Sequence, residues 1–326
     1  MCDNDDNTIS IAVVVPCYNE DAVVNLFYEK VSWLAKDWTV RGKQSVESVF
    51  VFVDDGSTDS TWECLVGLCN ACDDVVALRF SRNFGQRSAL LAGYDECIRL
   101  NTDVVISIDV DLQDDPTVIQ QMIDAWCEGA DIVFGIRDDR SSDSWMKRSS
   151  SGVYHAISSK LGVPSMGNMS EFSLMSRKAV EAFLLYGERD IYMRGVRASL
   201  GFNTAVVTYK RAKRVAGDSK YTLSKLVREA TVGIFSFSSV PLRIVSCMAG
   251  ISVLGAIFVL VWSIAQFVCG NAIPGWTSLM VSLWMIGAMV LVSLSVIGAY
   301  VERIFIESKA RPRYILSDRL VGNEFV

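Results

Sequence analysis

Val104-Val105-Ile106-Ser107-Ile108-Asp109-Val110-Asp111 is the stretch that decides the fold of this chain. It is an apolar, strand-like run that ends in two carboxylates separated by one residue. Carboxylate oxygens are preferred ligands of Mg²⁺ and Mn²⁺, so a buried strand that ends in this way can hold a divalent cation against a diphosphate. Gln113 offers a further oxygen ligand close by. Taken alone the Asp-x-Asp pair is a weak signal, because paired acids after a strand often only solvate a loop.

Five apolar runs separated by segments of helical spacing indicate an α/β fold. The runs are Ile9–Val15, Val49–Val53, Val75–Phe80, Val104–Ile108 and Ile132–Phe134. Continuously apolar strands that alternate with amphipathic helices are typical of a parallel sheet covered on both faces. Such sheets bind their ligands at the carboxyl ends of the strands.

A polar cluster follows each of the first four runs. The clusters are Pro16-Cys17-Tyr18-Asn19-Glu20, Asp54-Asp55-Gly56-Ser57, Ser81-Arg82-Asn83-Phe84-Gly85 and Asp109-Val110-Asp111. Four clusters at one edge are hard to explain as solvated loops, so they favour a binding site there. The chain has neither a Gly-x-Gly-x-x-Gly after the first run nor a Gly-x-x-x-x-Gly-Lys, which excludes the Rossmann dinucleotide fingerprint and the P-loop. A diphosphate must then be held by a metal and by cationic side chains.

Two long apolar runs in the last third of the chain predict membrane spans. Hydrophobic residues make up 51% of the sequence, and no charge occurs within 244–268 or 272–301. As helices the first run would reach about 37 Å and the second about 45 Å, each enough to cross a hydrocarbon core of about 30 Å. We therefore expect a hairpin of two transmembrane helices, at about 244–268 and 276–300. A pair of buried core helices is the alternative.

The charges around these runs predict their orientation. Arg243 precedes the first run, five basic residues follow the second, and the turn between them has none. The positive-inside rule then places both termini and the whole N-terminal region in the cytoplasm. The acidic residues 1–6 and the short first apolar run do not match a signal peptide. The nine cysteines are therefore expected to be reduced, and the single histidine, His155, argues against a histidine base or a histidine-rich metal site.

A basic stretch between residues 210 and 228 precedes the first predicted span. It contains seven Lys and Arg residues, Asp218 as its one acid, and an apolar face at helical spacing. Such a segment next to a span is typical of helices that lie along an anionic membrane surface. A solvated, charged helix is the alternative.

Ten segments spread in order over nearly the whole chain carry a family resemblance. They are Val14–Glu20, Val53–Asp59, Ser81–Gly85, Ile108–Asp114, Gly135–Arg137, Lys147–Arg148, Tyr192–Gly195, Arg214–Tyr221, Ser236–Arg243 and Arg311–Tyr314. With them the chain resembles the polyprenyl-phosphate glycosyltransferases, membrane enzymes akin to dolichol-phosphate mannose synthase and the bacterial bactoprenol-phosphate glucosyltransferases. The resemblance implies a GT-A-like, Rossmann-type nucleotide-sugar domain with interfacial helices and a C-terminal two-helix transmembrane hairpin.

The resemblance also implies a division of the chain and an activity. The expected parts are a cytoplasmic glycosyltransferase domain at 1–215, a juxtamembrane amphipathic region at 216–242, the two spans within 243–302 and a cytoplasmic tail at 303–326. The expected enzyme lies in the inner (plasma) membrane. It moves a hexose-type sugar from a nucleotide-sugar, expected to be a UDP-sugar, to undecaprenyl or dolichyl phosphate on the cytoplasmic leaflet. Mg²⁺ or Mn²⁺ would be the cofactor, and inversion at the anomeric carbon the expected outcome.

Site roles follow from the resemblance residue by residue. The residues implied to frame the base and ribose of the nucleotide are Pro16, Tyr18, Glu20, Asp54 and Asp55. Arg214 and Lys220 are implied to close over its diphosphate. Those implied for the metal and for catalysis are Asp109, Asp111 and, as a metal ligand only, Gln113. Those implied for the acceptor phosphate are Arg137 and Arg148, for which generic surface basicity is the alternative. A phosphate monoester with its second pKa near about 6 is already a nucleophile at neutral pH and needs no general base.

One segment departs from the family pattern. The bactoprenol branch usually carries Asp-Phe-Arg-Leu, where this chain has Glu171-Phe172-Ser173-Leu174. The acid is one methylene longer and the arginine is absent. If Glu171 touches the sugar, the donor can differ from the glucose common in this branch, so the sugar stays open.

Two other functions compete with this reading. A processive polysaccharide synthase shares the Asp-x-Asp domain and the spans, but the chain has no Gln-x-x-Arg-Trp motif and too few apolar runs for a channel. A non-catalytic, membrane-tethered nucleotide-sugar sensor or flippase scaffold would not need the intact Asp-x-Asp. The expected partners are the nucleotide-sugar, polyprenyl phosphate, the lipid bilayer and further copies of the chain, for which the family suggests a tetramer; no nucleic acid is expected.

Overall fold

A computed structural model describes most of the N-terminal two thirds of the chain and part of the remainder. The described residues are 8–41, 43, 45–137, 169–189, 191–210, 275–322 and 324–325, with single positions and short stretches between 245 and 262. The chain divides into two compact units. The first comprises 1–160, 164–227 and 312–326, and the second 161–163 and 228–311.

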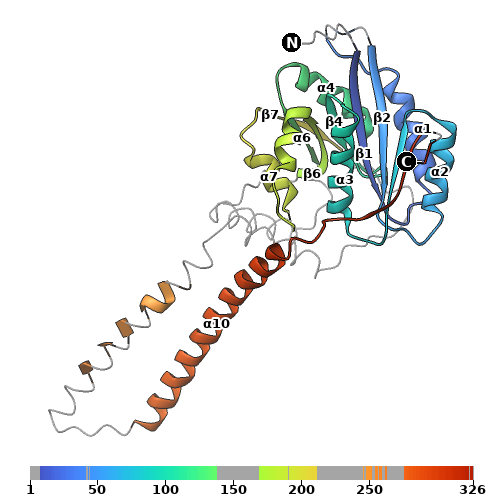
Figure 1. Ribbon diagram of the computed structural model, residues 1–326. Coiled ribbons are helices and arrows are strands. Elements are labelled where there is room, and N and C mark those ends of the chain that lie inside the picture. Colours follow the sequence, from blue (N-terminus) through green and yellow to red (C-terminus); the bar gives the residue numbers. More distant parts are fainter. Residues whose placement is uncertain are drawn as a thin grey trace. The chain divides into compact units, whose positions relative to one another are not determined.

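One mixed sheet forms the centre of the first unit (Figure 1). Across the described residues its nine strands run in the order β7-β5-β6-β4-β1-β2-β3-β8-β9. Their bounds are β1 Thr8–Cys17, β2 Ser45–Asp54, β3 Val75–Phe80, β4 Val104–Ser107, β5 Ile132–Arg137, β6 Met169–Ser176, β7 Thr204–Tyr209, β8 Leu316–Val321 and β9 Glu324–Phe325. The neighbours β4, β1, β2 and β3 are parallel, as the apolar runs predict. On the two flanks, β6 is antiparallel to β4 and β8 is antiparallel to β3.

Helices cover both faces of this sheet. Their bounds are α1 Val24–Ala35, α2 Thr61–Ala71, α3 Gln86–Arg99, α4 Ile119–Cys127, α6 Arg177–Leu184 and α7 Met193–Ser199, with a short 3-10 turn η1 at Pro116–Val118. Phe27 of α1 and Leu65 of α2 share one core cluster with Val13 of β1. On the opposite face α3 lies so close to β1 that a Cβ on Gly93 would stand 2.2 Å from Val14 Cγ1. The alternation of side chains along β1 thus buries both faces, which is why its run is continuously apolar.

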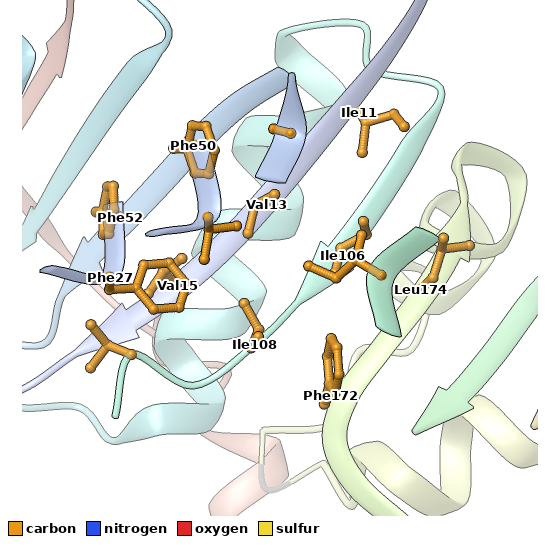
Figure 2. Packing of buried hydrophobic residues seen from close by; sticks show 14 of the residues in the cluster. Ile11, Val13, Val15, Phe27, Phe50, Phe52, Ile106, Ile108, Phe172 and Leu174 are labelled. Atoms are coloured by element: carbon orange, nitrogen blue, oxygen red, sulfur yellow. The ribbon is translucent and has the colours of Figure 1, made fainter. Parts of the chain in front are cut away.

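The core cluster fixes the strands whose ends carry the polar loops (Figure 2). Phe27 and Phe52 meet edge to face with ring centroids 6.2 Å apart, and both are fully buried. Burying an aromatic side chain of this size stabilises a fold by roughly 1.5–3 kcal/mol. The strand ends are therefore held rigidly relative to one another.

The C-terminal residues join this sheet. Residues 303–326 are the expected tail, but from residue 312 onward they belong to the first unit and supply β8 and β9. Leu320 of β8 is only 3% exposed and lies in the core cluster. No local pattern of strand and helix predicts that this segment returns to an edge formed near the start of the chain.

The second unit contains the helix α10, Trp276–Ser308. Among the described residues it is the one helix long and apolar enough to cross a membrane, over Met285–Ser308. The predicted span at 276–300 falls within α10. The predicted span at 244–268 and the amphipathic region at 216–242 lie mostly or wholly outside the described residues.

Candidate active site

The polar clusters begin side by side at the carboxyl edge of the parallel strands. Cys17 at the end of β1 is the register partner of Asp54 at the end of β2. Asp54 in turn pairs with Arg79 of β3, and Val14 pairs with Ser107, the last residue of β4. The loops after all four strands therefore leave the same edge, as predicted.

Asn19 joins the loops after β1 and β2. Its backbone N–H donates to Ser57 Oγ at 2.9 Å, and its Oδ1 accepts from the Thr58 N–H at 2.8 Å. Asn19 has a φ of +55°, a left-handed conformation that asparagine tolerates better than most residues. Its neighbours Tyr18 and Glu20, predicted to contact the nucleotide, are half-buried at this edge.

Asp55 joins the loops after β2 and β3. It is 3% exposed, and its carboxylate accepts backbone hydrogen bonds from Phe84 at 2.6 Å and Gly85 at 2.9 Å. Burial raises the pKa of Asp55 to about 6, although these two hydrogen bonds act to lower it. The carboxylate thus positions a loop, whatever else it contacts.

Asp54 is fully buried, and only one of its carboxylate oxygens accepts a hydrogen bond among the described residues. Its Oδ1 accepts from the Ser57 N–H at 3.0 Å. Its Oδ2 accepts no hydrogen bond among the described residues, and Arg79 Nε lies 3.5 Å from it. Burial raises the pKa of Asp54, while the bonds from Ser57 and the charge of Arg79 lower it. A buried acceptor oxygen without a hydrogen bond is costly unless a donor is supplied.

Gly56 is required by the close approach of the loops after β2 and β3. Its φ is +66°, and a Cβ there would lie 2.5 Å from the carbonyl carbon of Arg82 and 2.8 Å from the backbone nitrogen of Asn83. Both the dihedral angle and the space therefore exclude a side chain.

The Asp-x-Asp pair follows β4 in a strained turn. Asp109 is half-buried, and its Oδ1 accepts from Gln86 Nε2 at 2.7 Å. Asp111 Oδ1 accepts from the Gln113 N–H at 3.1 Å. Leu112 between them is 4% exposed and has a φ of +53°. A left-handed leucine is unfavourable and persists only where its surroundings enforce it, as at functional sites.

Negative charge accumulates around Asp109. Burial raises the pKa of Asp109 to about 7, with further contributions from the charges of Asp114, Asp111 and Glu171, while Arg137 lowers it. Carboxylates gathered in this way around Asp109 suit a cation. The donor set of Asp109 and Asp111, with the amide oxygen of Gln113, consists of the hard oxygens that Mg²⁺ and Mn²⁺ prefer.

No complete metal cage is formed by side chains in the described part of the chain, where no three His, Cys, Asp or Glu residues converge. This agrees with a Mg²⁺-type site, because Mg²⁺ is usually held by one or two carboxylates while substrate phosphates and water supply the remaining ligands. The residues present therefore fit a metal that binds together with a diphosphate.

Arg137, at the end of β5, lies beside these carboxylates. Its Nη2 is 3.2 Å from Asp114 Oδ1, and the Tyr209 hydroxyl lies 2.6 Å from the same oxygen. Tyr209 is also 2.9 Å from Ser170 Oγ. The Arg137 side chain remains 26% exposed, whereas Asp114 is buried. The Arg137 guanidinium is thus oriented by Asp114 and Tyr209, and its exposed part can still be reached by an anion.

Glu171, near the start of β6, is held by two arginines of α7. Arg194 Nε lies 3.1 Å from its Oε1, and Arg197 Nη2 lies 3.0 Å from its Oε2. Arg197 is 1% exposed and donates to the Tyr94 hydroxyl at 2.9 Å. Burial acts to raise the pKa of Glu171, but the two guanidinium groups outweigh it and hold the pKa below the ordinary value. The charge of Glu171 is thus balanced by two arginines from another element.

The comparison with protein families decides the identity of this domain. The family described as "Glycosyl transferase family 2" matches residues 12–184. The chain belongs to this family. As a family 2 glycosyltransferase it is an enzyme, so the non-catalytic sensor no longer competes. The predicted α/β glycosyltransferase fold is confirmed, and of the two predicted apolar helices the described residues contain one candidate.

Relatives cover this glycosyltransferase over nearly its full length. A bactoprenol glucosyl transferase of Shigella phage SfV is 40% identical over 95% of this chain and 99% of that protein. A prophage bactoprenol glucosyl transferase homolog of Escherichia coli is 38% identical over 94% of this chain and 98% of that protein. A solved mannosyltransferase from Pyrobaculum calidifontis is 14% identical with a TM-score of 0.42, covering 87% of this chain and 86% of that one. The two sequence relatives confirm the resemblance to the polyprenyl-phosphate glycosyltransferases.

The structure brings most of the predicted site residues of this glycosyltransferase to one sheet edge. These are Pro16, Tyr18, Glu20, Asp54, Asp55, Asp109, Asp111, Gln113, Arg137 and Glu171. Three further predicted residues, Arg148, Arg214 and Lys220, lie outside the described residues. The individual roles of all these residues remain predictions.

Several residues that shape the site were not predicted. Gln86 bonds Asp109, Asp114 orients Arg137, and Arg197 neutralises Glu171. Asp114 is the last residue of the segment Ile108–Asp114, and Gln86 directly follows Gly85. Their position next to these motifs is a signal in the sequence that could have identified both. Arg197 carries no local signal, because its partner is supplied by β6.

Proposed function

We propose that this glycosyltransferase moves a hexose-type sugar from a UDP-sugar to undecaprenyl or dolichyl phosphate, with Mg²⁺ or Mn²⁺ and with inversion at the anomeric carbon. The observation that carries the proposal is the crowding of Asp109, Asp111 and Arg137 at one sheet edge. It offers a place for a metal-bound diphosphate directly beside a cation for an anionic acceptor. The relatives named bactoprenol glucosyl transferases support a polyprenyl acceptor.

The nucleotide would lie over the loops after β1 and β2. Asp54 Oδ2 is a buried acceptor that lacks a hydrogen bond among the described residues. The N3–H of uracil is a single donor that needs such an acceptor, so the two suit each other. Asp109, Asp111 and Gln113 would hold the cation. When bound, a divalent cation stabilises the charge that develops on a departing nucleoside diphosphate.

The acceptor phosphate requires charge neutralisation rather than deprotonation. A phosphate monoester is largely ionised at neutral pH, because its second pKa is about 6. Its approach to an anionic donor is opposed by electrostatic repulsion. Arg137 is fixed by Asp114 and partly exposed, so it can pair with the phosphate while its orientation is maintained. Arg148 is the second candidate for this role.

Attachment to the membrane follows from the acceptor. A polyprenyl chain leaves the bilayer only at a cost of about 0.8 kcal/mol per exposed CH₂ group, so the enzyme must act at the headgroup plane. The long apolar helix α10 supports such attachment. In this proposal the enzyme is a multi-pass protein of the inner membrane with its catalytic domain and both termini in the cytoplasm. Reporter fusions at residues 271 and 326 test this: only the fusion at 271 should report from the far side.

A transfer assay tests the proposed reaction. Detergent-solubilised enzyme is incubated with undecaprenyl phosphate, Mn²⁺ and a panel of radiolabelled UDP- and GDP-sugars. We expect label to enter the organic phase with one UDP-sugar. Asp111→Asn should lower this transfer at least about a hundredfold while the protein still inserts into the membrane, because charge stabilisation of the leaving group is lost.

Asp115→Asn is the matched control. Asp115 accepts from the Thr117 N–H at 3.0 Å at the start of η1, a role that asparagine also fills. It should transfer sugar at nearly the wild-type rate. Normal turnover by Asp111→Asn would refute the metal assignment, and a wild-type enzyme that labels no lipid with any sugar would refute the proposed reaction.

A further inference from the structure

The C-terminal segment 314–321 packs along β3 and against the start of the loop between β3 and α3. β8 pairs antiparallel with β3 from Val76↔Val321 to Phe80↔Leu316. Beyond the last pair, the Ser81 N–H donates to the Ile315 carbonyl at 3.0 Å. The first residue of the loop is thus bonded to the last part of the chain, next to the edge that carries the active site.

Tyr314 makes the closest aromatic contact of this segment. Its ring stacks on Phe80, with centroids 5.2 Å apart and planes inclined by 14°. Its hydroxyl donates to Asp95 Oδ2 on α3 at 2.6 Å. Phe80 in turn meets Phe84 edge to face at 5.6 Å. Aromatic pairs of this kind stabilise by about 0.5–1.5 kcal/mol beyond their burial, and they constrain the orientation of the rings.

The loop that Tyr314 supports reaches two carboxylates of the site. The backbone N–H groups of Phe84 and Gly85 donate to Asp55. The next residue, Gln86, donates through Nε2 to Asp109 Oδ1 at 2.7 Å. A rotation of the Phe84 ring would therefore move the donors that hold both carboxylates.

A second contact anchors β8 without touching this loop. The Arg319 guanidinium grips the Glu96 carboxylate of α3, with Nη2 2.6 Å and Nε 3.1 Å from Oε1. Glu96 is 2% exposed. Because Arg319 holds the strand independently, a change at Tyr314 can alter the loop while β8 stays in place.

We propose that Tyr314 is a positioning residue of the active site, which acts through Phe80 and Phe84 to place Gln86 against Asp109. This rests on the proposed function, since the carboxylate placed in this way is the predicted metal ligand. The segment after α10 is then a working part of the catalytic domain. Enzyme shortened at residue 311 would lack one wall of its own site.

Three variants test the proposal. Tyr314→Leu removes the ring stack and the hydroxyl, Tyr314→Phe keeps the stack and loses only the bond to Asp95, and Arg319→Gln weakens the strand anchor alone. We expect Tyr314→Leu to lower kcat about tenfold or more at a temperature where it is fully folded, because small misplacements of reacting groups are costly. Tyr314→Phe should stay within about threefold of wild type, since the ring stack is kept. Arg319→Gln should lower the unfolding temperature at least as much as Tyr314→Leu and leave kcat of the folded enzyme unchanged.

Amide hydrogen exchange gives a readout that does not need the sugar chemistry. The Phe84 and Gly85 amides are protected by Asp55, so Tyr314→Leu should speed exchange in a peptide covering 81–86, while Tyr314→Phe and Arg319→Gln should not. If wild type transfers no sugar, the proposed function fails and exchange alone decides the role of Tyr314. If the wild-type enzyme is active, the proposal is overturned when Tyr314→Leu keeps both the kcat and the exchange rate of wild type. It is also overturned when Arg319→Gln loses as much kcat and as much amide protection as Tyr314→Leu.

Discussion

Two halves of the same sheet edge are held together by different interactions. In the backbone-bonded half, the loops after β1, β2 and β3, side-chain oxygens accept mainly from main-chain N–H groups. In the ion-paired half, around β4 to β7, charged side chains bind one another. The backbone-bonded half is represented by Asp55 with Phe84 and Gly85, and by Asn19 with Thr58. The ion-paired half is represented by Arg137 with Asp114 and by Glu171 with Arg194 and Arg197.

Because the interactions differ, different substitutions should destabilise the two halves. Where two loops bonded through their main chains approach each other, as at Gly56, no side chain fits between them. The backbone-bonded half should therefore be destabilised by a substitution that adds atoms there. Ion pairs depend on charge, so the ion-paired half should respond to lost partners and to pH. A substitution in one half should therefore leave the other half intact.

Arg197→Leu should give the largest effect. Arg197 is 1% exposed, and leucine would leave the Glu171 carboxylate without its buried partner. Breaking a buried ion pair from one side costs about 3–5 kcal/mol. We expect the free energy of unfolding to fall by about 4 kcal/mol in detergent, measured by urea titration. The double variant Arg197→Leu with Glu171→Leu should recover part of this loss. No recovery would show that Arg197 acts by packing alone.

Gly56→Ala should break the backbone-bonded half. The new Cβ would stand 2.5 Å from the Arg82 carbonyl carbon at a φ of +66°. Left-handed strain and overpacking together should cost about 3 kcal/mol. Gly201→Ala is the matched control, since its φ is +76° and nothing lies within 4 Å of its Cβ. It should cost only about 1 kcal/mol. Equal losses in the two variants would remove the steric argument.

The same difference explains how much of the molecule the sequence could predict. The backbone-bonded half is coded by contiguous motifs, because Asp54 to Gly56 and the clusters after β1 and β3 each carry their own turn chemistry. The parallel pairing around β1 was predicted from the apolar runs. The pairing of Glu171 with Arg197 depends on how α7 packs against β6, which no local pattern encodes. The return of Tyr314 and β8 to the edge of β3 is non-local in the same sense.

The pH dependence of stability should test the ion pair at Glu171. The pKa of Glu171 is held below its ordinary value by Arg197 and Arg194 despite burial. A carboxyl whose folded-state pKa is depressed contributes stability above its unfolded pKa, about 4.3, and loses it as pH falls through the lower folded value. Glu171→Gln should therefore be less stable than wild type at pH 7, and the gap should be smaller at a pH of about 3, below the unfolded pKa. A gap that is the same at both pH values would contradict the ion-pair account.

Tyr209→Phe should give the smallest effect and tests how far the ion-paired half depends on neutral groups. The Tyr209 hydroxyl lies 2.6 Å from Asp114 Oδ1 and 2.9 Å from Ser170 Oγ. Its removal loses hydrogen bonds but leaves Arg137 paired with Asp114, so we expect a loss of about 1–2 kcal/mol in unfolding free energy. Transfer by the folded enzyme should fall less than about threefold, because Arg137, the proposed ligand of the acceptor phosphate, keeps its ion pair with Asp114. A loss of more than about tenfold at full folding would mean that charge alone does not orient Arg137, and that the hydroxyl sets its position.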